Sequence, residues 1–169
     1  MMLIRRATEA DLEVVLQLIR RVVPQMQASG NPQWNEQYPN RQFFEHDVRL
    51  QQLWVAEDSG AIAGVVALTL DQTPEYANVG WDLQQEAIVA HRLAVDPEVR
   101  GKGVAMALMQ QAEVIAAERG TRLLRADTNS TNKAMQELFV KLGYLYAGET
   151  EFAGRPGLSF YCYEKQLAE

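Results

Sequence analysis

The pattern of apolar and polar positions along the 169-residue chain predicts helices and strands in a mixed order. Apolar residues at helical spacing predict a first helix, which begins near Thr8 and which Pro24 is expected to end. The same spacing predicts helices over residues 43–51 and 104–119, and a last helix that follows the cap residues 129–131 and stops before Gly143. Short apolar runs predict strands over residues 3–6, 53–57, 62–70, 88–95, 122–128, 144–148 and 158–163. Early hairpins and a late crossover indicate a mixed sheet with helices on both faces.

Two connectors between these elements are long and irregular, and both carry large aromatic side chains. Residues 25–40 contain Trp34 and Tyr38, and residues 71–86 contain Trp81. Long connectors inside compact domains are uncommon and are often functional. Two interpretations stay open: the aromatic residues fix the connectors to the core, or they form a lid over a substrate site.

The composition is typical of one well-buried domain, which we expect to span residues 1–169, because 47% of the residues are apolar. The net charge of −6 argues against nucleic-acid and anionic-membrane partners, since both need a basic face. Cys162 is the only cysteine, so no intrachain disulfide is possible and a cytoplasmic protein is expected. No apolar run suits an export signal or a membrane span. Two histidines and one cysteine in separate elements predict no metal site.

The stretch from Val95 to Ala105 has the chemistry of a phosphate-binding loop. It begins at the end of an apolar strand and passes through Gly101 and Gly103 into the helix over 104–119. The free N–H groups at a helix start attract anions, and two basic residues of the loop add positive charge. A P-loop is excluded because no Ser or Thr follows the Lys102-Gly103 pair. A dinucleotide-binding fingerprint is excluded because Met106 stands where a third Gly or Ala is needed.

Two segments of the chain resemble the GNAT superfamily of acyl-CoA-dependent N-acyltransferases. Arg100-x-x-Gly103-x-Ala105 is similar to the pyrophosphate-binding motif of that family. The segment from Asn132 to Tyr144 resembles a second family segment, in which an Asn opens a helix that ends in Lys-x-Gly-aromatic. Further matches, which point to a bacterial subgroup, are Gln33-Trp34, Tyr38-Pro39, His91 to Val95, Asp127-Thr128 and Cys162 to Lys165. The resemblance implies an α/β fold of mixed α+β character, with a central, mostly antiparallel sheet of six to seven strands and about four helices on both faces.

The resemblance also implies a binding site for acetyl-CoA as cosubstrate. Backbone groups of Leu93 and Val95 are expected to bind the pantetheine arm like an added edge strand. Asn132 is expected to contact the same arm, and the alternative is that it only caps a helix. Lys102 is expected either to reach a phosphate or to stay solvated. The amides expected to hold the pyrophosphate are those of Arg100, Gly101, Lys102, Gly103, Val104 and Ala105.

Transfer of an acyl group to an amine needs a base, because an alkyl ammonium carries its proton at neutral pH. His91 is the first candidate, since it matches a catalytic histidine of the similar serotonin-type N-acetyltransferases, although the position of their second histidine holds Val89. A packed structural histidine is the alternative. Carboxylates that could serve through water are Glu86, Asp127 and Glu164. In the family the oxyanion is bound by a backbone N–H at the distorted centre of the strand, which the resemblance places around Arg92 to Ala94.

The general acid of the family is missing, because Phe139 occupies the position where many members carry a tyrosine. Tyr144, Tyr161 or Cys162 could replace it, or solvent could protonate the leaving thiolate. Each of the three has core or strand packing as its alternative role.

The resemblance implies an N-acetyltransferase that acts on a primary amine of a small molecule or peptide, by direct attack in a ternary complex. A noncatalytic acyl-CoA-binding module of the same fold is the alternative, favoured by the missing tyrosine. Trp34, Tyr38 and Trp81 are expected to line the acceptor site. Asp127 or Glu164 is expected to receive a cationic amine. A homodimer is a further expectation from the family.

Overall fold

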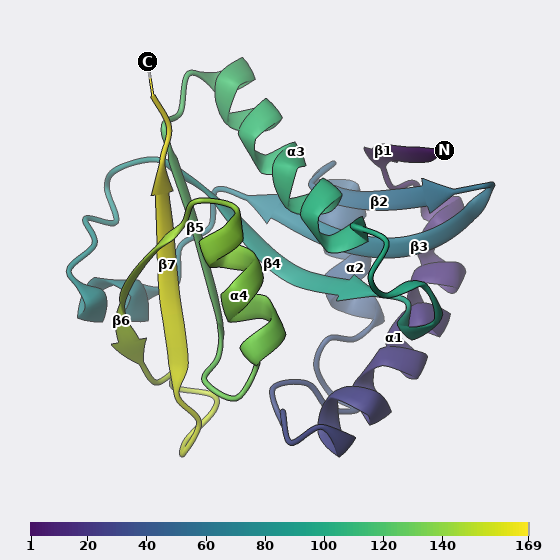
Figure 1. Cartoon of the computed structure of the whole chain (residues 1–169), viewed down its shortest axis with the longest axis horizontal. Coiled ribbons are helices and arrows are strands. Elements are labelled where there is room, and N and C mark those ends of the chain that lie inside the picture. The colour runs from purple at the N-terminus through teal and green to yellow at the C-terminus, as the bar shows by residue number, and fades with distance from the viewer. Residues whose placement is uncertain (169) are drawn as a thin grey trace. The chain divides into compact units, whose positions relative to one another are not determined.

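The computed structural model of the chain describes residues 1–168 and contains one sheet of seven strands in the order β1-β2-β3-β4-β5-β7-β6 (Figure 1). The strands are β1 Met2–Arg6, β2 Leu53–Asp58, β3 Ala61–Thr69, β4 Ala87–Val95, β5 Leu123–Asn129, β6 Leu145–Thr150 and β7 Phe160–Gln166. The α-helices are α1 Leu12–Ala28, α2 Arg41–Arg49, α3 Val104–Arg119 and α4 Lys133–Lys141. Three short 3₁₀ helices are η1 Glu9–Asp11, η2 Pro74–Val79 and η3 Pro97–Val99. Strands β4 and β5 run parallel, while the pairs β1·β2, β2·β3, β5·β7 and β6·β7 are antiparallel, which confirms the predicted fold class.

The described chain forms two compact units. The first contains residues 1–68 and 91–111, and the second contains residues 69–90 and 112–168. Strand β4 and helix α3 contribute residues to both. One domain over the whole chain therefore stays a prediction. No helix among residues 1–168 combines the length and the apolar composition needed to cross a membrane.

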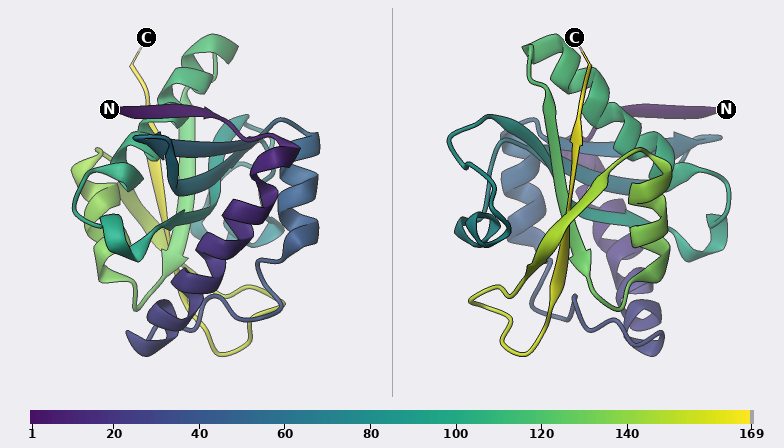
Figure 2. Two further views of the ribbon diagram at one scale, coloured as in Figure 1. Left: turned by 90° about the vertical axis from the view of Figure 1, so that its right-hand side faces the viewer. Right: turned by 60° about the vertical axis from the view of Figure 1, so that its left-hand side comes forward.

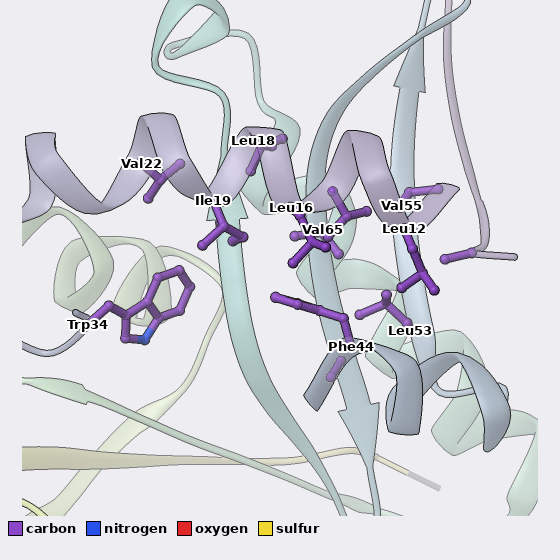
Figure 3. Close-up of a cluster of buried hydrophobic side chains, with 14 residues drawn as sticks. Leu12, Leu16, Leu18, Ile19, Val22, Trp34, Phe44, Leu53, Val55 and Val65 are labelled. Carbon is purple, nitrogen blue, oxygen red and sulfur yellow. The ribbon is translucent and has the colours of Figure 1, made fainter. Parts of the chain in front are cut away.

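The core of the first unit lies between α1, α2 and one face of β2 and β3. Helix α1 buries the residues that its periodicity predicts, and Figure 3 shows them above Phe44 of α2. Trp34, from the connector after α1, is 3% exposed and belongs to the same cluster. The other labelled members are Leu12, Leu16, Leu18, Ile19, Val22, Leu53, Val55 and Val65.

The prediction that Pro24 ends the first helix is wrong. Helix α1 continues to Ala28, and the amide of Ser29 still bonds to the carbonyl of Gln25 at 3.0 Å. Proline removes one helical hydrogen bond and disfavours the helix locally. Beyond it, Met26 packs against the core cluster, so tertiary contacts hold the last turn in place.

The opposite face of β3 brings the start of α3 close to the sheet. Successive strand residues point to opposite faces, so Gly64 lies on the face that Val65 does not use. A Cβ atom on Gly64 would lie 2.8 Å from Val104 Cγ1 and 3.0 Å from the carbonyl oxygen of Ala94. Glycine at this position therefore allows the first turn of α3 to rest directly on β3, beside the end of β4.

Replacing Gly64 by alanine is expected to lower the free energy of unfolding by about 1–3 kcal/mol, because the added methyl group has no room. Chemical denaturation measures this effect. Gly154→Ala is the matched control, since a Cβ at Gly154 meets nothing within 4 Å. Equal stability of the two variants would contradict the close packing of α3 on β3.

The second unit is built on β5, β7 and β6, with β7 in the middle (Figure 2). In the register of these strands, Arg125 of β5 lies opposite Glu164 of β7, and Asp127 lies opposite Cys162.

The cap residues of the last helix differ from those predicted. The side chain of Asn132 accepts the bond from the Met135 amide at 3.2 Å, and residues 129–131 form the turn before it.

Candidate functional site

The exit from β4 is held in the first unit by the side chain of Asp96. Its carboxylate accepts a bond from the Glu98 amide at 3.0 Å and pairs with Arg21 at 2.7 Å. Its own amide donates to the Ala63 carbonyl of β3 at 2.8 Å. Burial alone would raise the pKa of Asp96, but the Glu98 amide and Arg21 lower it. Asp96 is therefore a negatively charged anchor that fixes the direction in which the chain leaves the strand.

The loop between η3 and α3 has the conformation that the glycines predict. Gly101 and Gly103 have left-handed φ values of 83° and 78°, and a Cβ on either would meet nothing within 4 Å. The Gly103 carbonyl accepts the Ala107 amide at 3.0 Å, which begins α3. Arg100 and Lys102 are exposed. An open loop with two exposed cations, leading into a helix N-terminus, fits a pyrophosphate group.

Strand β4 contains a residue in a conformation that strands do not normally have. Within residues 1–168, three residues other than glycine have positive φ: Gln51, Ser59 and Arg92. Gln51 follows helix α2, and Ser59 lies in the β2–β3 turn, where left-handed residues are ordinary. Arg92 has φ 54° inside β4, between His91 and Leu93. The distortion therefore lies next to residues for which a catalytic or cofactor-binding role is predicted.

Arg92 is held by a buried carboxylate from α2. Its Nε donates to Asp47 Oδ2 at 2.8 Å, and its Nη2 donates to Asp47 Oδ1 at 2.7 Å. Asp47 is fully buried. A third donor, Nη1, reaches the Tyr38 hydroxyl at 3.3 Å, and the guanidinium lies 5.6 Å from the centre of the Phe43 ring. Burial alone would lower the pKa of Arg92, but the hydrogen bonds and charge of Asp47 have the larger effect, so the pKa of Arg92 is raised.

Three residues predicted for the acceptor site lie in one network of the second unit. The Tyr76 hydroxyl bonds to Asp127, and the Tyr76 ring meets Trp81 edge-on at 4.9 Å. Trp81 also lies under Arg125, whose guanidinium is 4.8 Å from the ring centre. Arg125 donates to Glu164 at 2.8 Å, so the charge of Glu164 is already paired. Asp127, by contrast, is engaged by the neutral hydroxyl of Tyr76.

Burial raises the pKa of Asp127 to about 6, against a lowering by the Tyr76 hydrogen bond and the charge of Arg155. Between about pH 4 and 6, Asp127 therefore keeps its proton in the folded protein but has lost it in the unfolded chain. The contribution of Asp127 to the free energy of unfolding is fully present below about pH 4 and is lost as the pH rises through about 6.

Asp127→Asn, which cannot ionise, is expected to gain stability relative to the native sequence as the pH rises from about 4 to 7. Tyr76→Phe removes a bond that favours the ionised carboxylate, so it is expected to move the same transition to higher pH. Urea denaturation at several pH values tests both variants. A difference between Asp127→Asn and the native sequence that does not depend on pH would contradict the raised pKa.

The two aromatic residues of the first connector lie in the first unit. Trp34 is part of the core, and Tyr38 accepts the bond from Arg92 and packs edge-on against Phe43 at 4.8 Å. A hollow of about 750 Å³ lies on the same unit. Its lining includes neither Trp34 nor Tyr38 and consists of Leu16, Ile19, Arg20, Val23, Pro24, Gln27, Asn35, Glu36, Gln37, Pro39, Asn40 and Arg41.

Of the three candidate acids, Tyr144 and Cys162 are buried in the second unit, and Tyr161 is half-buried. Phe139 is 2% exposed and packs against Tyr144 and Tyr163, with ring centres 5.6 Å and 5.0 Å away. Burial raises the pKa of Tyr144, and it raises the pKa of Cys162 to about 12. Both groups therefore hold their protons strongly. Glu86, a candidate base, is exposed, and Arg119 and Thr121 lower its pKa.

Several residues of these networks were not among the predicted site residues. Arg92 and Arg125 are charged residues within apolar strands, and Asp47 follows Phe44 by three positions on the buried face of α2. A charge at a position that should be apolar needs a partner, so this pattern is the signal that could have found them. Among residues 1–168, no group of three or more His, Cys, Asp or Glu side chains is placed to hold a metal ion.

Comparisons with known proteins agree with the predicted fold and family. YwnH of Bacillus subtilis (strain 168), whose name assigns it provisionally as a phosphinothricin acetyltransferase, is 27% identical over 158 residues, 91% of this chain and 93% of YwnH. A GNAT-family acetyltransferase structure from Streptococcus agalactiae has a TM-score of 0.85 at 26% identity and covers 99% of this chain and 96% of its own. The structure of yncA from Salmonella typhimurium, solved with acetyl-CoA, has a TM-score of 0.73 at 19% identity, covers 100% of this chain and 95% of its own, and supports the fold alone.

The family assignment rests on the length of the match as well as on these relatives. The sequence profile of the "Acetyltransferase (GNAT) family" matches residues 17–144. This range runs from α1 to the end of the second predicted family segment and contains the glycine loop. The chain therefore belongs to the acetyltransferase (GNAT) family.

Proposed function

We propose that this protein is an N-acetyltransferase that transfers the acetyl group of acetyl-CoA to a primary amine of a small molecule or peptide, by direct attack in a ternary complex. The observation that carries the proposal is the open loop of Gly101 and Gly103, which leads from β4 into α3 with Arg100 and Lys102 exposed. The name of YwnH supports a small-molecule acceptor, and membership of the acetyltransferase (GNAT) family supports acetyl-CoA as the cosubstrate. A cytoplasmic setting and a homodimer belong to the same proposal.

In this proposal the cofactor residues keep the roles that the family implies. The amides from Arg100 to Ala105 bind the pyrophosphate, and Lys102 adds a charge beside it. Backbone groups of Leu93 and Val95 bind the pantetheine arm, and Asn132 contacts the arm while it caps α4. Acetyl-CoA supplies an activated acetyl group as a thioester.

The chain has to remove a proton from the amine, hold the carbonyl oxygen and receive the amine. We assign the removal of the amine proton to His91 as general base. His91 is half-buried and directly precedes the distorted residue of β4. Backbone N–H groups of residues 92–94 donate to the oxygen. Asp127 receives the cationic amine, with Tyr76 as its hydrogen-bond partner and Trp81 beside it. The other predicted acceptor residues have no direct role in this proposal. Trp34 belongs to the core, Tyr38 bonds to Arg92, and Glu164 pairs with Arg125.

One observation favours a second candidate, a noncatalytic acyl-CoA-binding module. Phe139 is packed into the core at the position of the tyrosine acid of the family, and phenyl cannot donate a proton. Burial also raises the pKa of Cys162 and Tyr144, which disfavours them as replacements. In an enzyme with this sequence the leaving thiolate takes its proton from Tyr161 or from solvent, and solvent is feasible because a thiol is an acceptable leaving group.

Release of free coenzyme A separates the two candidates. The native protein is incubated with acetyl-CoA and a panel of phosphinothricin, amino acids, polyamines and short peptides, and free thiol is followed with a colorimetric reagent. Amine-dependent release supports the enzyme. Tight acetyl-CoA binding in calorimetry without release for any amine supports the binding module, and absence of both would overturn the placement of the ligand.

A further inference from the structure

The left-handed conformation of Arg92 needs a physical explanation. A residue with a side chain in this region is disfavoured, and such a residue persists only where its surroundings impose it. The strand on either side is regular enough to be assigned as β4, from Ala87 to Val95. The backbone is therefore distorted at one residue, directly after His91 and directly before Leu93.

The surroundings that impose this conformation come from α2. Asp47 engages two nitrogens of Arg92, and its Oδ1 also accepts a bond from the Gln52 side chain at 2.9 Å. Helix α2 is itself fixed, because Asn40 caps its first turn and Phe44 is fully buried in the core. The arginine side chain thus ties one residue of β4 to a rigid helix by two short bonds.

Stability alone does not account for this arrangement. Asp47 is fully buried and the Arg92 side chain is 11% exposed, so both charges have lost most of their water. A buried ion pair is often no more stabilising than apolar residues of the same size, because desolvation offsets the attraction. A planar guanidinium with two hydrogen bonds fixes the orientation of its side chain, whereas an apolar contact does not.

We propose that Arg92 is a positioning residue: its ion pair with Asp47 holds the left-handed turn of β4 and thereby aligns His91 on one side and the amides of residues 92–94 on the other. This inference rests on the proposed acetyl transfer, in which those groups act. The Tyr38 hydroxyl shares the same guanidinium at 3.3 Å, so the connector after α1 is tied to the same point. The side chain of Arg92 itself touches neither the acetyl group nor the amine.

The test uses Arg92→Lys, which keeps the charge but cannot place two nitrogens on both oxygens of Asp47. We expect kcat to fall on the order of tenfold, because small misplacements of reacting groups are costly, while the Kd for acetyl-CoA stays within about threefold. Amide hydrogen exchange in residues 91–94 is expected to become faster. Unchanged kcat in the folded variant would overturn the positioning role.

Arg5→Lys is the matched control. Arg5 also donates to both oxygens of an aspartate, Asp11, at 2.9 Å and 3.0 Å, but it lies on β1. A merely structural role predicts that both variants lose stability and keep kcat. The positioning role predicts that kcat falls in Arg92→Lys and not in Arg5→Lys.

A milder variant guards against a failure of Arg92→Lys to fold. Gln52→Leu leaves both charges in place and removes only the amide that steadies Asp47 Oδ1. We expect a smaller fall in kcat, with faster exchange at residues 91–94, and native values of both would contradict the proposal. If the native protein releases no coenzyme A with any amine, the proposed function fails and this role with it. If it turns over and Arg92→Lys matches it, only the positioning role fails.

Discussion

Replacing Gly103 by aspartate is expected to weaken acetyl-CoA binding about 100-fold, or about 2.7 kcal/mol. Gly103 has φ 78° and directly precedes α3, and a Cβ added there would meet nothing within 4 Å. In the proposed complex the pyrophosphate fills this space. A carboxylate there adds bulk and a like charge at short range, which opposes the anion far more than it disturbs the free protein. Isothermal titration calorimetry measures the loss.

The other end of the same helix provides the control. Gly120 follows α3 with φ 74°, and it too has nothing within 4 Å of an added Cβ. Aspartate is unfavourable at a helix C-terminus and favourable at an N-terminus, so Gly120→Asp should be the less stable of the two variants. It should nevertheless bind acetyl-CoA like the native protein. Native affinity in Gly103→Asp would show that the ligand has been placed wrongly, and Gly103→Asn separates the effect of charge from that of size.

Replacing His91 by glutamine is expected to lower kcat by about 100-fold, because a general base contributes at least this much to proton transfer. The Kd for acetyl-CoA should stay within about twofold, since the imidazole is not among the groups assigned to the cofactor. The acid limb of the pH profile, which reports loss of the free base, should disappear. Steady-state kinetics between about pH 6 and 9 measure these changes.

The chain contains only one other histidine, His46, which is exposed on α2. His46→Gln makes the same substitution away from β4 and is expected to leave kcat and the pH profile unchanged. If His91→Gln also turns over at the native rate, His91 is not the base, and Asp127 with its raised pKa becomes the next candidate.

Local signals were sufficient to predict most of the fold. The strands and helices follow apolar periodicity, and every expected strand overlaps an observed one, with ends that differ by about three residues at most. One exception has a tertiary cause. Pro24 does not end α1, because packing beyond it outweighs the local cost, and this outcome cannot be derived from the residues near it alone. The cap of α4 is local: Asn132 caps the helix in place of residues 129–131, which is the alternative role that its sequence position left open.

The candidate site was less accessible to prediction, for a physical reason. The glycine loop depends on residues adjacent in sequence, so its left-handed glycines can be expected from the motif. The partners of Arg92 and Arg125 are 45 and 39 positions away, and no local pattern says which acid will meet which base. The strand distortion around Arg92 was expected from the family resemblance alone, because arginine rarely has positive φ and no local pattern signals it.

The burial of Cys162 has a practical consequence for every measurement of turnover. The thiol is fully buried, and its pKa is raised to about 12, so thiolate is scarce at the pH of a colorimetric assay. The folded protein should therefore add almost no background to the signal of released coenzyme A. The same thiol becomes reactive when the second unit unfolds. Slow reaction of one thiol per chain with the reagent, in the absence of substrate, would therefore identify a variant with an unstable second unit before its kinetics are interpreted.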